Sequence, residues 1–226
     1  MTHRQRRTCI IHAGMLKTGT TSIQSSLFHG LQRGPFRLLT LDPFTGNLLV
    51  GSAFAGDYGI GERFISNGVT PRGAALLTRQ SRDYLDRSLA AAARRGITPI
   101  LSAEIIGMLA RDDVARLRSF VVERGWEPRV IMYVRAPLDL LESMFQQRVR
   151  AGDVASRIPP ELAAYIAYTI RQGFSRPLDV VEGVFGREAV EYHFYDPSQF
   201  PDRCVVRHFC GIAGVSLPEN AVLREN

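Results

Sequence analysis

The chain has 226 residues, of which 45% are hydrophobic and 22% are charged, a composition that excludes a disordered or low-complexity chain. Its 28 lysines and arginines outnumber its 22 acidic residues, giving a net charge of +6. Such a charge suits nucleic acid, an acidic polymer or a polyanionic small molecule. Arginine is spread along the whole chain without a nucleic-acid-binding motif, and no apolar run approaches the ~20 residues of a membrane span. We therefore expect one domain over residues 1–226 that neither binds nucleic acid nor inserts into a membrane.

The N-terminus and the cysteines indicate a cellular compartment. The basic start is followed by an apolar run only one strand long, which leads into glycine and lysine and does not fit a signal peptide. Cys9, Cys204 and Cys210 have no zinc-ligand spacing and cannot all pair, which indicates reduced thiols. These features predict a cytoplasmic protein, and the cysteines predict no metal site.

Strand-like and helix-like patterns alternate along the chain. Short apolar runs predict strands at residues 9–13, 36–41, 97–102, 129–134 and 189–194. Helical spacing of apolar residues predicts helices at 20–32, 73–95, 105–111, 112–125, 137–150, 161–172, 176–186 and 203–214. Between these elements, Trp126-Glu127-Pro128 is predicted to be a turn, residues 151–160 a polar loop, and residues 42–72 a long irregular segment. This alternation predicts an α/β fold whose mainly parallel sheet has helices on both faces.

The most informative stretch is CIIHAGMLKTGTTSIQ, from Cys9 to Gln24. It has the order of a strand, a glycine-flanked loop and a helix start, where free backbone N–H groups and the helix dipole favour phosphate or sulfate. Gly14 and Gly19 allow the backbone to curl around such an anion, and Lys17 supplies a full positive charge. Further hydroxyl donors are Thr20, Thr21 and Ser22.

The glycine spacing matches a Walker A motif, which needs lysine directly after the second glycine. Thr20 stands there, and the lysine lies two residues before that glycine, which weakens an ATPase or kinase interpretation. HAGMLKTGTTSIQ instead resembles the loop of sulfotransferases that use 3′-phosphoadenosine-5′-phosphosulfate (PAPS), above all bacterial carbohydrate-type sulfotransferases. The resemblance implies a P-loop NTPase-like three-layer α/β fold. It also implies cofactor contacts from Lys17, Thr18, Gly19, Thr20, Thr21 and Ser22.

A second stretch, residues 130–147, has a strand-to-helix pattern with arginine at the strand end. A P-loop NTPase often has an acidic magnesium ligand there, whereas Arg135 suits an anionic ligand. Arg135 and Ser143 match the R-x-P-x-D-x-x-x-S pattern of sulfotransferases, and Gln147 matches their S-x-[YF]-x-Q. The resemblance implies that Arg135 and Ser143 bind the 3′-phosphate of PAPS. The structural alternatives are an ion pair between Arg135 and Asp139, and a helix-surface hydroxyl at Ser143.

Two residues are candidates for the catalytic base. Glu104 follows a predicted strand, in a stretch where the family often has L-I-S-S-E; Ser102 and Glu104 match it, and Ala103 departs. Glu104 is placed to accept the proton of an attacking hydroxyl, or it is a helix N-terminal carboxylate stabilised by the dipole. His12, at the end of the first strand, is the rival base, although a single histidine at a strand end is more often structural. The family frequently has a second histidine where this chain has Leu16, which leaves the acceptor open.

Together these motifs imply a sulfotransferase that moves the sulfuryl group of PAPS, leaving the product PAP, to a hydroxyl or amine of an acceptor. The acceptor class is a small molecule or glycan: a carbohydrate, glycolipid or secondary metabolite. Lys17 and the loop amides would stabilise charge on the bridging oxygen, and no metal is required because sulfuryl carries less charge than phosphoryl. Two alternatives stay open: a P-loop nucleotide or small-molecule kinase, and a non-catalytic PAP-binding protein. Residues 42–72 either cover the acceptor site or form a connector.

Overall fold

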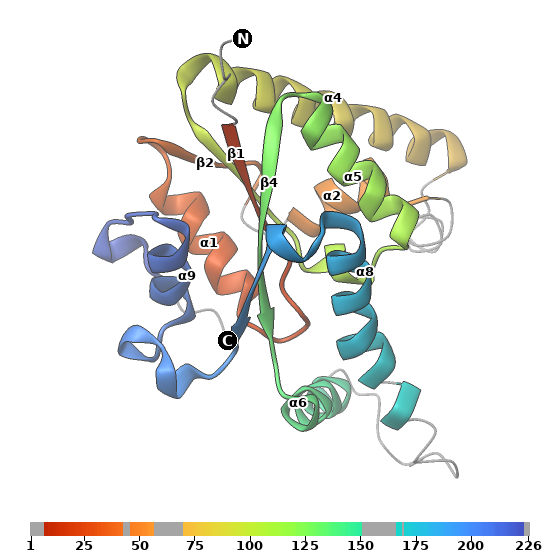
Figure 1. The fold of residues 1–226 in the computed structure, drawn as a ribbon, viewed down its shortest axis with the longest axis vertical. Coiled ribbons are helices and arrows are strands. Elements are labelled where there is room, and N and C mark those ends of the chain that lie inside the picture. The colour runs from red at the N-terminus through yellow and green to blue at the C-terminus, as the bar shows by residue number, and fades with distance from the viewer. Residues whose placement is uncertain (1–6, 43–45, 57–69, 151–165, 169, 224–226) are drawn as a thin grey trace.

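The structure is a computed structural model that describes residues 7–42, 46–56, 70–150, 166–168 and 170–223 (Figure 1). A central sheet has the strand order β2-β3-β1-β4-β5. Its strands are β1 (Arg7–His12), β2 (Phe36–Leu38), β3 (Thr98–Ser102), β4 (Trp126–Val134) and β5 (Val190–Phe194). Every strand pairing in the described ranges is parallel, which confirms the predicted α/β sheet and brings all the carboxyl ends to one edge.

Helices cover both faces of this sheet (Figure 1). The helices α1 (Thr20–Gly30) and α9 (Val205–Ala213) pack on one face. The other face carries α2 (Gly46–Phe54), α4 (Pro71–Arg95), α5 (Arg111–Glu123) and α8 (Arg176–Phe185). At the carboxyl end of β4, the helix α6 (Pro137–Arg150) follows. Since the loop of residues 13–19, Arg135 and Glu104 all follow strand ends, this architecture places them along the same edge.

The apolar strands have this arrangement because they are buried on both sides. Successive side chains of a strand point to opposite faces. In β1, Cys9 and Ile11 join the core beneath α4, α5 and α8, whereas Ile10 joins the core beneath α1 and α9. A strand with helices over both faces therefore needs a continuous apolar run, which is the pattern from which these strands were predicted.

Helix ends follow the local chemistry of the chain. The helix predicted at 73–95 is confirmed as α4 and begins two residues earlier, at Pro71. Thr70 caps it by accepting a hydrogen bond from the Gly73 amide at 3.1 Å, and Gly96 ends it with a left-handed φ of 64°. The segment after β3 is a single short 3₁₀ helix, Glu104–Met108, shorter than the predicted 105–111 helix.

Two predictions are wrong. Trp126-Glu127-Pro128 is not a turn; it opens β4 and pairs with the start of β1, because Gly125 makes the turn one residue earlier with a φ of 77°. The segment 42–72 is not irregular throughout, since Gly46–Phe54 forms α2. This helix is buried on most sides, so its sequence has no polar face to produce a helical periodicity. The predicted strand at 36–41 ends early, at Leu38.

Other predictions fall outside the described residues. They include residues 57–69 of the irregular segment, the loop predicted at 151–160 and the first part of the helix predicted at 161–172. The helix predicted at 176–186 is α8, and the one predicted at 203–214 is the shorter α9. Among the residues that the structure describes, no helix combines the length and the apolarity that crossing a membrane would require.

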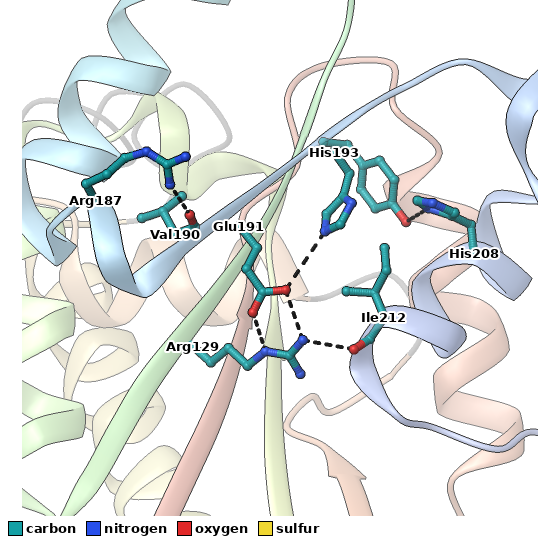
Figure 2. Close-up of polar contacts among 8 residues, drawn as sticks. Arg129, Arg187, Val190, Glu191, His193, His208 and Ile212 are labelled. Carbon is teal, nitrogen blue, oxygen red and sulfur yellow. Dashed lines mark hydrogen bonds and ion pairs between the residues drawn. The ribbon is translucent and has the colours of Figure 1, made fainter.

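A polar cluster fixes α9 against β4 and β5 (Figure 2). Arg129 on β4 bridges Glu191 on β5 and the carbonyl of Ile212 on α9, with Nη2 donating at 2.9 Å to each. On the same side, Tyr133 Oη lies 2.8 Å from His208 Nδ1 of α9. Because Val205 of α9 also lies close to Gly19 of the loop between β1 and α1, these contacts help to fix the helix that packs beside that loop.

Candidate anion-binding site

The loop between β1 and α1 first continues along β4 and then reverses. The Ala13 amide donates to the Ile131 carbonyl at 3.1 Å, and the Met15 amide donates to the Tyr133 carbonyl at 3.4 Å. The hydroxyl of Thr18 then donates back to the Met15 carbonyl at 2.7 Å. Lys17 has a left-handed φ of 63°, a conformation that non-glycine residues rarely adopt, and its side chain is exposed. The loop therefore presents its only charged side chain to solvent at the sheet edge.

The start of α1 fits an anion. Gly19 is its N-cap residue and makes no side-chain cap hydrogen bond. The first amides of a helix have no intrahelical partner, and their partial positive charge attracts phosphate or sulfate. Thr21 is exposed on this first turn, whereas Ser22 is buried. Because glycine has no side chain, the cap residue does not occupy the first backbone amides of α1 as hydrogen-bond donors.

The two loop glycines are required by close contacts. A Cβ on Gly14 would lie 2.4 Å from Thr20 Oγ1 and 3.1 Å from Thr18 Oγ1. At Gly19, the left-handed φ of 74° would be strained for another residue, and a Cβ would lie 2.7 Å from Val205 Cγ1 of α9. The loop can therefore adopt this closely packed conformation only with glycine at both positions.

Thr20 supplies a test of whether the loop fits a phosphosulfate group. Its side chain is 3% exposed, and Oγ1 has no hydrogen-bond partner among the described residues. A buried hydroxyl without a partner costs free energy, which a ligand oxygen would recover. Together with the exposed cation of Lys17 and a cap residue that makes no side-chain hydrogen bond, this hydroxyl is compatible with an anionic group at the loop.

Arg135 is tied to the loop. It follows β4, and its Nη1 donates to the Lys17 carbonyl at 2.8 Å. Within the described ranges no ion pair joins Arg135 to Asp139, so the alternative structural role is not observed. Two cationic residues that are far apart in the sequence thus lie at one loop. Ser143 lies half-buried within α6.

Tyr195 is a site residue that the motifs did not predict. Its ring centroid lies 5.6 Å from the Arg135 guanidinium, and its Cε2 would lie 3.6 Å from a Cβ on Gly19. Burial raises the pKa of Tyr195, and the charge of Arg135 opposes that rise. The signal available in the sequence was its position directly after the last predicted strand, because all the strand ends of a parallel sheet share one edge.

Glu104 faces the same edge from β3. It is the first residue of the short 3₁₀ helix Glu104–Met108 and is half-buried. Burial raises the pKa of the Glu104 carboxyl, while the positive charge of Lys17 lowers it. The structure therefore brings Glu104 within the electrostatic reach of Lys17, although the two residues are 87 positions apart in the sequence.

His12 is enclosed in the core. Its side chain is 0% exposed, and burial lowers its pKa to about 3, so the imidazole is neutral at physiological pH. Nδ1 lies 2.8 Å from Ser102 Oγ, and the ring packs 5.1 Å from the ring of Phe209. Nε2 has no partner among the described residues and would lie 3.5 Å from a Cβ on Gly14. Thus His12 lies directly beneath the loop rather than at its exposed side.

No protein-family model matches the chain, and no curated protein matches it by sequence. A sulfotransferase from Alicyclobacillus acidocaldarius superposes with a TM-score of 0.49 at 18% identity, over 97% of this chain and 87% of that one. A tunicamycin resistance protein from Deinococcus radiodurans gives 0.49 at 16% identity, over 93% and 98%. The sulfotransferase domain from the curacin biosynthetic pathway gives 0.48 at 13% identity, over 97% and 78%. These values describe a likeness in overall fold, and the functional proposal rests on the site residues.

Proposed function

We propose that the protein is a PAPS-dependent sulfotransferase that transfers a sulfuryl group to a hydroxyl or amine of a small-molecule or glycan acceptor. The observation that carries the proposal is that two cationic residues belong to the loop before α1, where the Arg135 guanidinium donates to the backbone carbonyl of Lys17. The strand end that precedes α6 carries this arginine in place of an acidic residue. A pair of cationic residues at one loop is suited to a nucleotide that carries phosphate at both its 3′ and 5′ positions.

When bound, PAPS would supply the sulfuryl group and a phosphate leaving group. We assign Lys17, the first amides of α1 and the buried hydroxyl of Thr20 to the stabilisation of negative charge beside the loop. Arg135 uses one N–H on the Lys17 carbonyl, and its guanidinium has further donors for a second phosphate. In this proposal Ser143 assists Arg135 at the 3′-phosphate.

We assign the role of general base to Glu104. Because burial raises its pKa, its carboxylate is a stronger proton acceptor than an exposed one. The positive charge of Lys17 opposes this rise and favours the ionised form that a base needs. His12 is fully buried beneath the loop, which separates it from an acceptor arriving from solvent. The geometry therefore favours Glu104 over His12 for the proton transfer.

Calorimetric titration with PAP and with ATP–Mg²⁺, followed by a transfer assay with ³⁵S-labelled PAPS, tests the proposal. We expect PAP to bind and Lys17→Ala to lower turnover by ~10²–10³, the usual effect of losing a preorganised charge donor. Arg33→Ala, which removes another exposed cation just beyond α1, is the matched control and should leave turnover unchanged. Binding of ATP–Mg²⁺ without PAP would instead support a kinase, and PAP binding without transfer to any acceptor would indicate a non-catalytic binding protein.

A further inference from the structure

The end of β3 is held by a network of buried hydrogen bonds. Gln24 of α1 donates from Nε2 to the Ser102 carbonyl at 2.7 Å. The Ser102 hydroxyl lies 2.8 Å from His12 Nδ1, and the Ala103 amide donates to the His12 carbonyl at 3.0 Å. The side chains of His12, Gln24 and Ser102 are 0%, 6% and 2% exposed. Two elements, β1 and α1, thus fix the two residues that precede Glu104.

The residue after Glu104 is fixed from a third element. The Ile105 amide donates to Asn47 Oδ1 of α2 at 3.1 Å. The start of α2 packs so tightly that a Cβ on Gly46 would lie 2.4 Å from the Ser102 carbonyl oxygen and 2.8 Å from Gln24 Nε2. Consequently α2 closes over the network, and the backbone is anchored on both sides of Glu104.

These contacts have one feature in common. The side chains come from β1, α1 and α2, and all of them bind the backbone or the hydroxyl of residues 102–105. Within that segment, the sole titratable side chain is Glu104. Hydrogen bonds between buried groups are costly to leave unmade, so a segment tied at several points keeps a single position.

We propose that His12, Gln24 and Asn47 are positioning residues that hold the Glu104 carboxylate at a fixed place opposite Lys17. The expected effect on kcat rests on the proposed function, whereas the expected effect of the Glu104 charge on Lys17 does not. His12 acts through Ser102 and does not itself accept the proton of the acceptor. Since a displacement of about 1 Å can reduce a reaction rate by about 10²-fold, a loosened network should lower kcat much more than it weakens nucleotide binding.

Lys17 is the only lysine in the sequence, so a label on lysine reports on this one position. Reductive methylation with ¹³C-formaldehyde labels Lys17 and the N-terminal amine, whose signals separate in an NMR spectrum. In the wild-type protein the Lys17 methyl signal should shift as Glu104 titrates, and the shift should vanish in Glu104→Gln. We expect Asn47→Leu and Gln24→Met to reduce that shift at least twofold. The control variant Tyr84→Phe should retain the shift. It also removes one hydrogen bond from a side chain to a backbone carbonyl, but that bond joins Tyr84 of α4 to Thr40 and is not part of the network around Glu104.

The kinetic arm uses the same variants in the labelled-PAPS assay. We expect kcat to fall roughly 10–100-fold in Asn47→Leu and Gln24→Met, with PAP affinity within about twofold of the wild-type value. Folded variants with an unchanged Lys17 shift and an unchanged kcat would overturn the inference, leaving the network a purely structural one. If the wild-type protein neither binds PAP nor transfers sulfate, but the Lys17 shift responds as expected, the positioning stands and the proposed function fails.

Discussion

The neutral state of His12 leads to a strong pH dependence that can be calculated. Burial lowers its pKa from the ordinary value of 6.5 to about 3. Between those values the unfolded chain binds more protons at this position than the folded chain, so the free energy of unfolding falls as the pH falls. Summed from pH 6.5 to pH 4.5, this single group should cost about 2 kcal/mol of stability.

Urea unfolding at pH 6.5, 5.5 and 4.5 measures this contribution when the wild-type protein is compared with His12→Asn. The variant should be less stable at every pH, but its free energy of unfolding should fall by about 2 kcal/mol less over the same range. The other groups cancel in the comparison, including His193 and His208, whose pKa values burial also lowers. Equal pH slopes in the two proteins would refute a neutral buried His12 and would return it as a candidate base.

Two further predictions concern the anion site. Arg135→Ala should weaken PAP binding by several kcal/mol if the phosphate site is desolvated, and AMP binding far less, because AMP lacks the 3′-phosphate. Calorimetry with both nucleotides measures the ratio of the two affinities. An equal loss for both nucleotides would make Arg135 a structural residue. Gly19→Ala should weaken PAP binding and lower the melting temperature, because the added Cβ would lie 2.7 Å from Val205 Cγ1 in a left-handed backbone conformation. Gly34→Ala is the matched control, since Gly34 also has a positive φ but no heavy atom lies within 4 Å of the added Cβ.

The sequence alone determined the features whose cause is local. The spacing of Gly14, Lys17 and Gly19 encodes a tight loop before a helix, and each requirement lies within a few consecutive residues. The strands were predictable because burial on both faces demands continuous apolar runs. The strand end at Arg135 was predictable for the same reason. Local patterns failed in α2, where burial on most sides removed the helical periodicity. They also failed at Trp126, which was expected in a turn but is the first residue of β4.

Only the tertiary structure decided what surrounds the loop. Gln24 and Ser102 are 78 positions apart, and nothing in either stretch predicts that the amide of one donates to the carbonyl of the other. The same holds for Tyr195 beside Arg135 and for Asn47 against Ile105. These contacts depend on the order of the strands and on how closely helices pack upon them. Both are set by the packing of the whole core. The loop sequence that suggests an anion site is therefore local, whereas the position of Glu104 relative to Lys17 is fixed by the fold.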